Sequence, residues 1–308
     1  MNVLTVTLNP CIDRTVKVSG FSNIEKKIRE DAGGKGINVA RVLSKSGIKC
    51  ICTGIMPKVG SEIIYKTLES DGIEYDFAET EGNLRVNIKM VDDKTGETTE
   101  KNEKGFVKDK KAVSEFMYIY EKYLSESGVV VLSGSVAEGI NKDIYKTLIE
   151  KAKKADKKVI LDSSGDFFRI GIKALPTVIK PNLSEFENLI GYEITNESKL
   201  KNAVMELYAL GIEIVAVSMG ADGAVFSKGG KLIKTKPFAA DIKNTVGAGD
   251  SMVAAIAYSM LKGYDLIHLS RLATSAGTLT ATFDGTDFCS LKIAEGFMDK
   301  IEIINTNK

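Results

Sequence analysis

Short apolar runs rich in β-branched residues alternate with helical patterns along most of this 308-residue chain. Such runs are typical of strands that are buried on both faces, and the helical patterns repeat their apolar residues at one-turn spacing. The expected strands lie at residues 3–8, 50–55, 129–132, 159–161, 177–179 and 214–217. The expected helices lie near residues 37–43, 63–68, 142–155, 183–189, 199–210, 251–262 and 266–281. This alternation predicts an α/β fold with a doubly wound, mostly parallel sheet that helices cover on both faces.

A different pattern interrupts the alternation in two segments, about residues 14–31 and 84–101. Polar residues there alternate with apolar or β-branched ones, as in Arg85–Val91, and residues 92–96 have the composition of a hairpin turn. Alternation of this kind indicates a sheet with one face in water. We therefore expect a small antiparallel β lid, built from two insertions into a single domain of residues 1–308. Its other face covers either the substrate or a second subunit, and we expect a homodimer formed through the lid.

Charge and composition exclude several classes of protein. The 42 Lys and Arg residues nearly balance the 41 Asp and Glu residues, and the net charge of +1 favours neither nucleic acid nor a membrane as partner. No apolar run approaches the roughly 20 residues that a bilayer-spanning helix needs. The only histidine, His268, rules out a histidine-based triad or a multi-histidine metal site. The cysteines lack redox or zinc spacing and the chain starts without a signal-peptide pattern, so we expect a cytoplasmic protein.

The segment Asn244–Ser251, with the sequence NTVGAGDS, precedes an apolar run that predicts a buried helix beginning near Ser251. Its glycines allow backbone N–H groups to point into one space, which the positive end of the helix also faces, so the segment predicts an anion site. Asp250 beside such a site suggests a base that removes a proton from an attacking hydroxyl. The alternative is that Asp250 only caps the helix.

Two familiar nucleotide-binding motifs do not describe this segment. A Walker A loop requires a glycine, four residues and then Gly-Lys-Ser/Thr, which no part of the chain contains. A dinucleotide fingerprint requires a third glycine where this chain has Met252. A phosphate bound here is therefore bound in another way.

Other polar segments occur where predicted strands end. Asp13 follows the first strand, and the glycine cluster of Gly33–Arg41 (GGKGINVAR) opens a helix with Asn38 one turn in. Ser133–Ser135, Lys180–Glu185 and Ser218–Gly223 follow three later strands. In a parallel sheet the carboxyl ends of the strands meet at one edge, so these segments are expected to form one site.

Together these segments resemble the PfkB, or ribokinase-like, carbohydrate kinases over essentially the whole chain. The GGKG-x-N helix and the late N-T-V-G-A-G-D segment match the two signatures of that family. Leu8-Asn9-Pro10 before Asp13, combined with GGKGINVAR, resembles the branch that acts on phosphorylated ketohexoses, the 1-phosphofructokinases and tagatose-6-phosphate kinases. The resemblance implies a ribokinase-like fold and a kinase that uses ATP and Mg²⁺.

The resemblance also implies a role for each matching position. Asp250 would be the base, and the amides of Gly247, Ala248 and Gly249 would hold the transferring phosphoryl group. Asn182 and Glu185 would organise Mg²⁺, through water. The nucleotide would contact Lys180, Asn182, Ser218, Gly220, Ala221, Gly223, Gly249 and Ser275.

The sugar side of the expected site carries both hydroxyl-binding and cationic residues. Its members are Asp13, Gly33, Gly34, Lys35, Asn38, Arg85, Lys89 and Ser135. Arg85 is the first choice for the substrate's phosphate because a guanidinium binds it with two hydrogen bonds, and Lys35 and Lys89 are further choices. The alternative for Lys89 is a solvated strand lysine.

The leading hypothesis is an ATP-dependent kinase that converts fructose 1-phosphate to fructose 1,6-bisphosphate. Its nearest alternative is the same chemistry on tagatose 6-phosphate or fructose 6-phosphate. A non-catalytic sugar-phosphate sensor is an alternative of another class, which the presence of Asp250 disfavours because a sensor needs no base.

Overall fold

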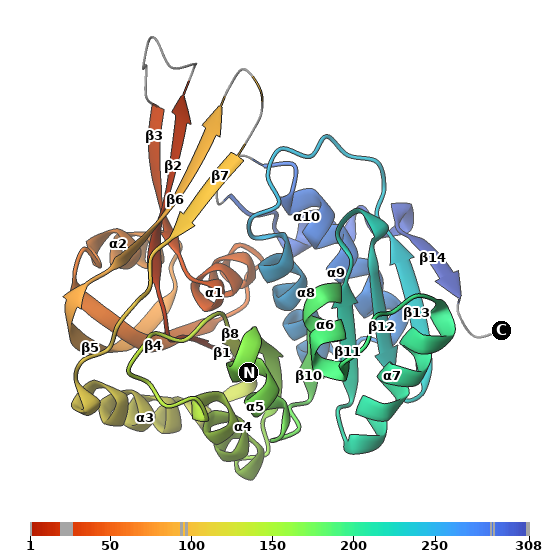
Figure 1. The fold of residues 1–308 in the computed structure, drawn as a ribbon, viewed down its shortest axis with the longest axis horizontal. Coiled ribbons are helices and arrows are strands. Elements are labelled where there is room, and N and C mark those ends of the chain that lie inside the picture. The colour runs from red at the N-terminus through yellow and green to blue at the C-terminus, as the bar shows by residue number, and fades with distance from the viewer. Residues whose placement is uncertain are drawn as a thin grey trace.

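The computed structural model describes residues 2–18, 27–92, 95, 98–283, 285 and 287–305. Within these residues a ten-stranded sheet has the order β14-β13-β12-β11-β10-β9-β8-β1-β4-β5 (Figure 1). Its strands are β1 (Asn2–Thr7), β4 (Cys50–Val59), β5 (Glu74–Asn83), β8 (Ser127–Ser133), β9 (Lys158–Asp162), β10 (Val178–Ile179), β11 (Ile214–Ser218), β12 (Ala224–Lys228), β13 (Lys231–Lys236) and β14 (Glu302–Asn305). The strands from β5 to β11 in this order are parallel, and β12, β13 and β14 add an antiparallel edge.

Helices pack on both faces of this sheet and create two separate cores. One core includes residues of α1 (Lys35–Lys45), α2 (Glu62–Ser70), α8 (Ala248–Lys262), α9 (Leu266–Thr280) and α10 (Leu291–Glu295). The other includes residues of α3 (Lys110–Leu124), α4 (Ile144–Lys154), α5 (Gly165–Ile172), α6 (Leu183–Ile190) and α7 (Glu197–Leu210). Strand β8 contributes side chains to both cores, because successive residues of a strand point to opposite faces. Val129 and Val131 lie in the first core, and Val130 and Leu132 lie in the second.

The structure confirms the doubly wound, mostly parallel α/β fold that the sequence predicts. The expected strands and helices are present, but helices α3, α5 and α10, strand β5 and the edge strands β12 to β14 were not expected. β5 and β13 mix polar and apolar residues and carry exposed side chains, so the pattern of a fully buried strand is missing there. β12 is buried on both faces, but its apolar run is only three residues long. No helix in the described part of the chain is long and apolar enough to cross a bilayer.

A separate four-stranded sheet forms the lid, with the order β3-β2-β6-β7. Its strands are β2 (Cys11–Val18), β3 (Lys27–Gly33), β6 (Arg85–Asp92) and β7 (Thr98–Asn102). The hairpins β2·β3 and β6·β7 are antiparallel, as expected, and they join through a parallel pair between β2 and β6. Residues 93, 94 and 96 of the expected hairpin turn, and residues 19–26 of the first insertion, lie outside the described residues.

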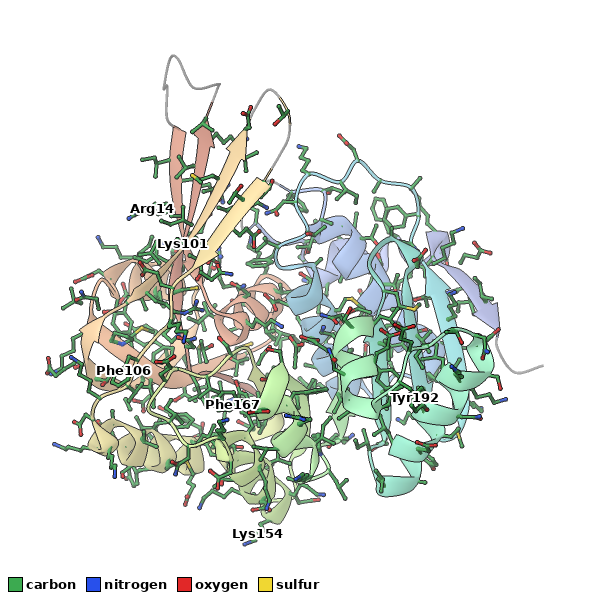
Figure 2. All side chains as sticks on the ribbon, in the orientation of Figure 1. Arg14, Lys101, Phe106, Lys154, Phe167 and Tyr192 are labelled. Atoms are coloured by element: carbon green, nitrogen blue, oxygen red, sulfur yellow. The ribbon has the colours of Figure 1, made fainter. Side chains whose placement is uncertain are left out.

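The lid stands away from the body (Figure 1). The register of its strands places different side chains on its two faces. Asp13 is in register with Asp31 and Asn87, which places these polar residues in one row across three strands. Val16 is in register with Ile28 and Met90, which form an apolar row. Each of these residues is three positions along its strand from the polar row, and side chains alternate between the faces, so the apolar row lies on the opposite face. Figure 2 shows Arg14 and Lys101 on the same sheet.

Candidate active site

A cavity of about 910 Å³ lies between the lid and the carboxyl ends of the parallel strands. Its lining comes from β2, β6 and β7 of the lid, from the ends of β1, β8 and β11, and from the first turns of α1 and α8. Most of the candidate residues from the sequence line it: Asp13, Gly34, Lys35, Asn38, Arg85, Lys89, Ser135, Lys180, Asn182, Glu185, Ser218, Gly247, Gly249 and Asp250. The sheet thus brings segments from both halves of the chain to one place, as expected for strand ends of an α/β sheet.

Six candidate residues lie outside this lining: Gly33, Ala248, Gly220, Ala221, Gly223 and Ser275. Gly33 is the last residue of β3 and lies directly against the Asp13 carboxylate, since a Cβ at Gly33 would lie 2.4 Å from Asp13 Oδ2. Gly220 and Ala221 lie in the exposed 3₁₀ turn η1 (Gly220–Asp222). Ser275 is fully buried in α9 and its hydroxyl donates to the Ala294 carbonyl at 2.8 Å, so this side chain serves helix packing.

Helix α8 begins at Ala248, three residues before the expected start near Ser251. Gly247 is its N-cap, with a left-handed φ of 81° that a side chain rarely adopts. A Cβ at Gly247 would lie 2.5 Å from Phe288 Cε1, so only glycine fits there. Asp250 therefore lies inside the first helical turn and is not the cap, which removes the capping alternative.

The Asp250 carboxylate is almost completely buried, with 5% of the residue exposed. Its Oδ2 accepts a hydrogen bond of 2.8 Å from the Asn38 amide of α1. Burial raises the pKa of Asp250 to about 6, and nearby Asp162 adds to this effect, while Lys35 and the Asn38 hydrogen bond oppose it. Such a carboxylate is ionised at neutral pH and is more basic than an exposed aspartate.

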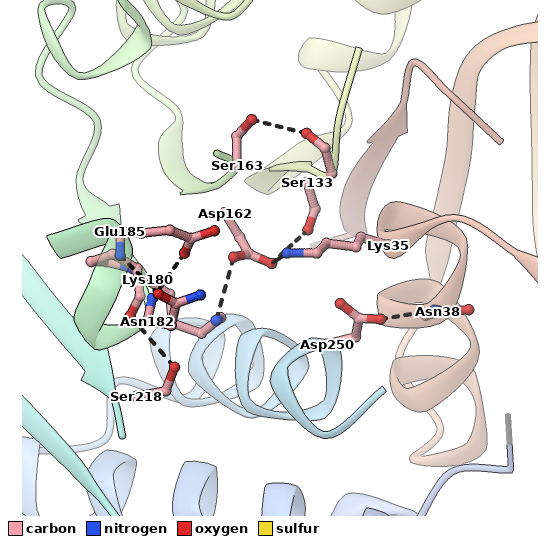
Figure 3. A network of polar contacts seen from close by, with 12 residues as sticks. Lys35, Asn38, Ser133, Asp162, Ser163, Lys180, Asn182, Glu185, Ser218 and Asp250 are labelled. Carbon is pink, nitrogen blue, oxygen red and sulfur yellow. Dashed lines mark hydrogen bonds and ion pairs between the residues drawn. The ribbon is translucent and has the colours of Figure 1, made fainter. Parts of the chain in front are cut away.

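Asp162, at the end of β9, is a member of the site that sequence analysis missed. Its Oδ2 lies 3.2 Å from Lys35 Nζ and accepts from the Ser133 hydroxyl at 3.1 Å, and its Oδ1 lies 3.3 Å from Lys180 Nζ (Figure 3). Burial raises the pKa of this carboxyl, but Lys180 and Lys35 outweigh burial and hold it below its usual value. We call Lys35, Asn38, Asp162, Lys180 and Asp250 the floor cluster.

Hydrogen bonds connect the polar side chains on the lid side of the cavity. Asn87 donates to Asp13 Oδ1 at 2.9 Å and accepts from Arg85 Nη1 at 2.7 Å. Arg85 also donates to the Asn9 carbonyl. Lys89 donates to Asn244 Oδ1 at 2.9 Å, so it bridges the lid to the segment that leads into α8. Among the described contacts, both cations therefore pair with neutral oxygens.

Asn182 and Glu185 form a reciprocal capping box at the start of α6. The Asn182 side chain accepts from the Glu185 amide at 2.8 Å, and Glu185 Oε2 accepts from the Asn182 amide at 2.9 Å. The second carboxylate oxygen of Glu185 remains for a ligand in the cavity. The part of the chain that the structure describes contains no group of three or more His, Cys, Asp or Glu side chains that could hold a metal ion.

Comparisons with known proteins identify the family of this chain. Residues 6–293 match the model of the pfkB family of carbohydrate kinases. The chain is 33% identical to a 1-phosphofructokinase from Rhodobacter capsulatus over 89% of both proteins, and 33% identical to a tagatose-6-phosphate kinase from Staphylococcus epidermidis over 98% of this chain and 99% of that one. The solved structure of a possible 1-phosphofructokinase from Thermotoga maritima has the same fold, with a TM-score of 0.89 over 100% of both chains at 24% identity. The chain therefore belongs to the pfkB family of carbohydrate kinases.

Proposed function

We propose that this enzyme transfers the γ-phosphoryl group of ATP to a hydroxyl of a phosphorylated ketohexose, with fructose 1-phosphate as the leading substrate and fructose 1,6-bisphosphate as the product. The observation that carries the proposal is the buried Asp250 carboxylate in the first turn of α8, which faces a cavity with a polar lid. The names of the related 1-phosphofructokinase and tagatose-6-phosphate kinase support a phosphorylated ketohexose as acceptor.

Asp250 is the proposed general base. Asn38 fixes one carboxylate oxygen at 2.8 Å and leaves the other for the acceptor hydroxyl. A pKa of about 6 keeps the carboxylate ionised at neutral pH while raising its affinity for the proton that the hydroxyl loses. The hydroxyl oxygen then attacks the γ-phosphorus, and the bond to the β-phosphate oxygen of ATP breaks to release ADP.

The start of α8 supplies the proposed anion hole. Among the described residues, the amides of Gly249 and Asp250 have no acceptor, as expected for the first turn of a helix. The Ala248 amide makes only a long contact of 3.3 Å to the Thr245 carbonyl. Free N–H groups and the positive helix end together stabilise the negative charge that builds on the transferring group.

The sugar phosphate is proposed to bind under the lid. Asp13 accepts hydrogen bonds from sugar hydroxyls, with Gly33, Gly34, Asn38 and Ser135 beside it. Arg85, Lys35 and Lys89 offer positive charge to the substrate's own phosphate, and neither Arg85 nor Lys89 is neutralised by a carboxylate in the described contacts.

ATP is proposed to lie on the side of Lys180, Asn182, Glu185 and Ser218. The free Glu185 oxygen fits a water-mediated contact with Mg²⁺ on the nucleotide, which would supply charge neutralisation on the phosphates. Asn182 contributes differently from the sequence-based expectation, because its side-chain oxygen already accepts from the Glu185 amide.

A substrate panel tests this function. ADP release with Mg·ATP is measured with fructose 1-phosphate, tagatose 6-phosphate, fructose 6-phosphate, the unphosphorylated hexoses and ribose. We expect kcat/KM for fructose 1-phosphate to exceed the others by at least ~10-fold, which is about 1.4 kcal/mol of differential transition-state binding. Preference for another phosphorylated ketohexose would keep the mechanism and change the substrate, and absence of turnover with every sugar would overturn the proposal.

We also propose that two copies pair through the apolar row of the lid. Ile28 and Met90 are 58% and 46% exposed, and Val16 lies between them in the sheet. Exposed apolar patches often mark the contact surface of a partner, and we infer that a second copy of this chain covers the apolar row.

A further inference from the structure

Asp162 is a buried carboxylate to which the proposed chemistry assigns no step. It ends β9, is 1% exposed, and stands in register with Ser133, the last residue of β8, which donates to it. Removing a charge from water costs several kcal/mol unless well-placed partners compensate. Replacing a buried ion pair by well-packed apolar residues is often neutral or stabilising, so the stability of the fold does not account for this charge.

Two lysines bind the two oxygens of this carboxylate from different sides. Lys35 is the first residue of α1, next to Gly34 and one turn before Asn38, on the sugar side. Lys180 follows β10 and precedes Asn182, on the nucleotide side. The Lys180 ammonium also lies against the start of α8, since a Cβ at Gly249 would be 3.5 Å from its Nζ. Figure 3 shows the carboxylate between the two lysines.

We propose that Asp162 is a positioning residue for phosphoryl transfer, which holds Lys35 and Lys180 on opposite sides of the path from nucleotide to sugar. The inference rests on the proposed function. The group in transfer spreads negative charge over its oxygens, and cations that are already in place stabilise that charge without moving. A free lysine loses rotamer entropy when it is held in one position, and anchoring by Asp162 removes part of this loss from the transfer step.

A role of Asp162 as a metal ligand fits the structure less well. Its Oδ2 is engaged by Lys35 and Ser133, and its Oδ1 faces Lys180. A Mg²⁺ ion at the same oxygens would meet two ammonium groups. The remaining alternative is a purely structural ion pair that joins α1 to the sheet.

The pH dependence of turnover separates positioning from a purely structural role. The charged groups around Asp162 are Lys35 from α1, Lys180, Glu185 from α6 and Asp250 from α8. Asp162 is the main cause of the raised pKa of Lys35, and it adds to the effect of burial on Asp250. Replacing Asp162 by a neutral residue therefore lowers both pKa values, and the lower pKa of Asp250 moves the acidic limb of the kcat/KM profile to lower pH.

The experiment compares Asp162→Asn with Asp166→Asn, a control in the same segment whose half-exposed carboxylate pairs with Lys142 at 2.8 Å. Wild type is assayed first, with the sugar that the panel selects. We expect Asp162→Asn to lower kcat by roughly 100-fold, with smaller changes in both KM values, because misplacement of a preorganised group by about 1 Å has an effect of that size. We also expect the acidic limb to move to lower pH, and Asp166→Asn to match wild type in both measurements.

Ser133→Ala is the second variant, since it removes only one hydrogen bond from Asp162 and leaves the charges in place. We expect it to lower kcat several-fold, and this result would support the inference even if Asp162→Asn did not fold. Normal kcat in a folded Asp162→Asn, or a reduced kcat with an unmoved pH profile, would overturn the positioning role while wild-type turnover keeps the proposed function. Normal kcat in Ser133→Ala together with an unfolded Asp162→Asn would also overturn it, and wild type without turnover would overturn both proposals.

Discussion

The floor cluster and the lid use charge in different ways. In the floor cluster, two buried carboxylates and two lysines lie in fixed positions at the ends of strands and helices, and Asp162 directly joins the lysines. On the lid, the half-buried Arg85 and Lys89 contact only neutral oxygens among the described residues, and their charge is available to a ligand. Under the proposed function, this difference assigns the chemistry to the floor cluster and the selection of the sugar phosphate to the lid.

The largest expected effect comes from Asp250→Asn. We expect kcat to fall by roughly 10³-fold, because a general base contributes about 10²- to 10⁴-fold, with little change in either KM. Steady-state ADP release measures both. Ordinary turnover in this variant would remove Asp250 as the base.

Gly247→Ala is expected to have the next largest effect. The left-handed φ of 81° costs a side chain about 1–2 kcal/mol, and the new Cβ overlaps Phe288, so the start of α8 must shift and kcat should fall by about 100-fold. Gly263→Ala is the matched control, since Gly263 caps the other end of the same helix at φ 70° with open space around it. Urea unfolding and kcat are measured for both variants. Equal losses of kcat in Gly247→Ala and Gly263→Ala would show that the strained helix caps, and not the position of the anion hole, cause the loss.

Arg85→Ala tests the lid in isolation. We expect KM for the phosphorylated sugar to rise by about 10-fold or more, with KM for ATP nearly unchanged, because a charged hydrogen bond is worth about 1.5–3 kcal/mol. Lys101→Ala, an exposed lysine on β7, serves as the control. A similar rise in both KM values would assign Arg85 a structural role, in holding the Asn9 carbonyl.

A smaller effect than those of the three substitutions is expected from the pH dependence of kcat/KM and of Tm. Asp250 accepts a proton only when ionised, so kcat/KM should fall as pH drops below about 6. The raised pKa also means that ionised Asp250 destabilises the fold. This cost is absent below the unfolded pKa and is complete above about pH 6, so Asp250→Asn should raise Tm at pH 7.5 and change it little at pH 4.

The substrate's own phosphate titrates in the same pH range, and Asn38→Leu separates the two groups. Asn38 donates to Asp250 and lowers its pKa, so loss of this donor should move the acidic limb to higher pH. An unmoved limb would assign the titration to the substrate.

The smallest effect on catalysis is expected from the lid's apolar row. Met90→Lys should convert a dimer to a monomer in light scattering with little loss of kcat, and Ile293→Lys, an equally exposed apolar position on α10, should leave the dimer intact. A monomeric wild-type protein at assay concentration would remove the lid dimer.

Sequence reasoning reached the fold and many residues of the cavity because their signals are local. The glycines beside Asp250 and the run of strand-end motifs are visible without knowing which strands are neighbours. Asp162 and Asn87 were missed for the opposite reason. Asp162 gains its role from the register of β9 with β8 and from Lys35, 127 residues away, and Asn87 gains its role from the parallel pairing of β6 with β2. The start of α8 was misplaced because its N-cap is Gly247, which has no side chain to mark a capping position in the sequence.

The division between floor and lid is tested most directly by measuring kcat and both KM values of wild type, Asp250→Asn and Arg85→Ala with the same phosphorylated ketohexose. We predict that Asp250→Asn changes kcat alone and that Arg85→Ala changes mainly KM for the sugar phosphate. If both variants lowered kcat with unchanged KM, or both raised KM with unchanged kcat, the separation of chemistry from substrate selection would be contradicted.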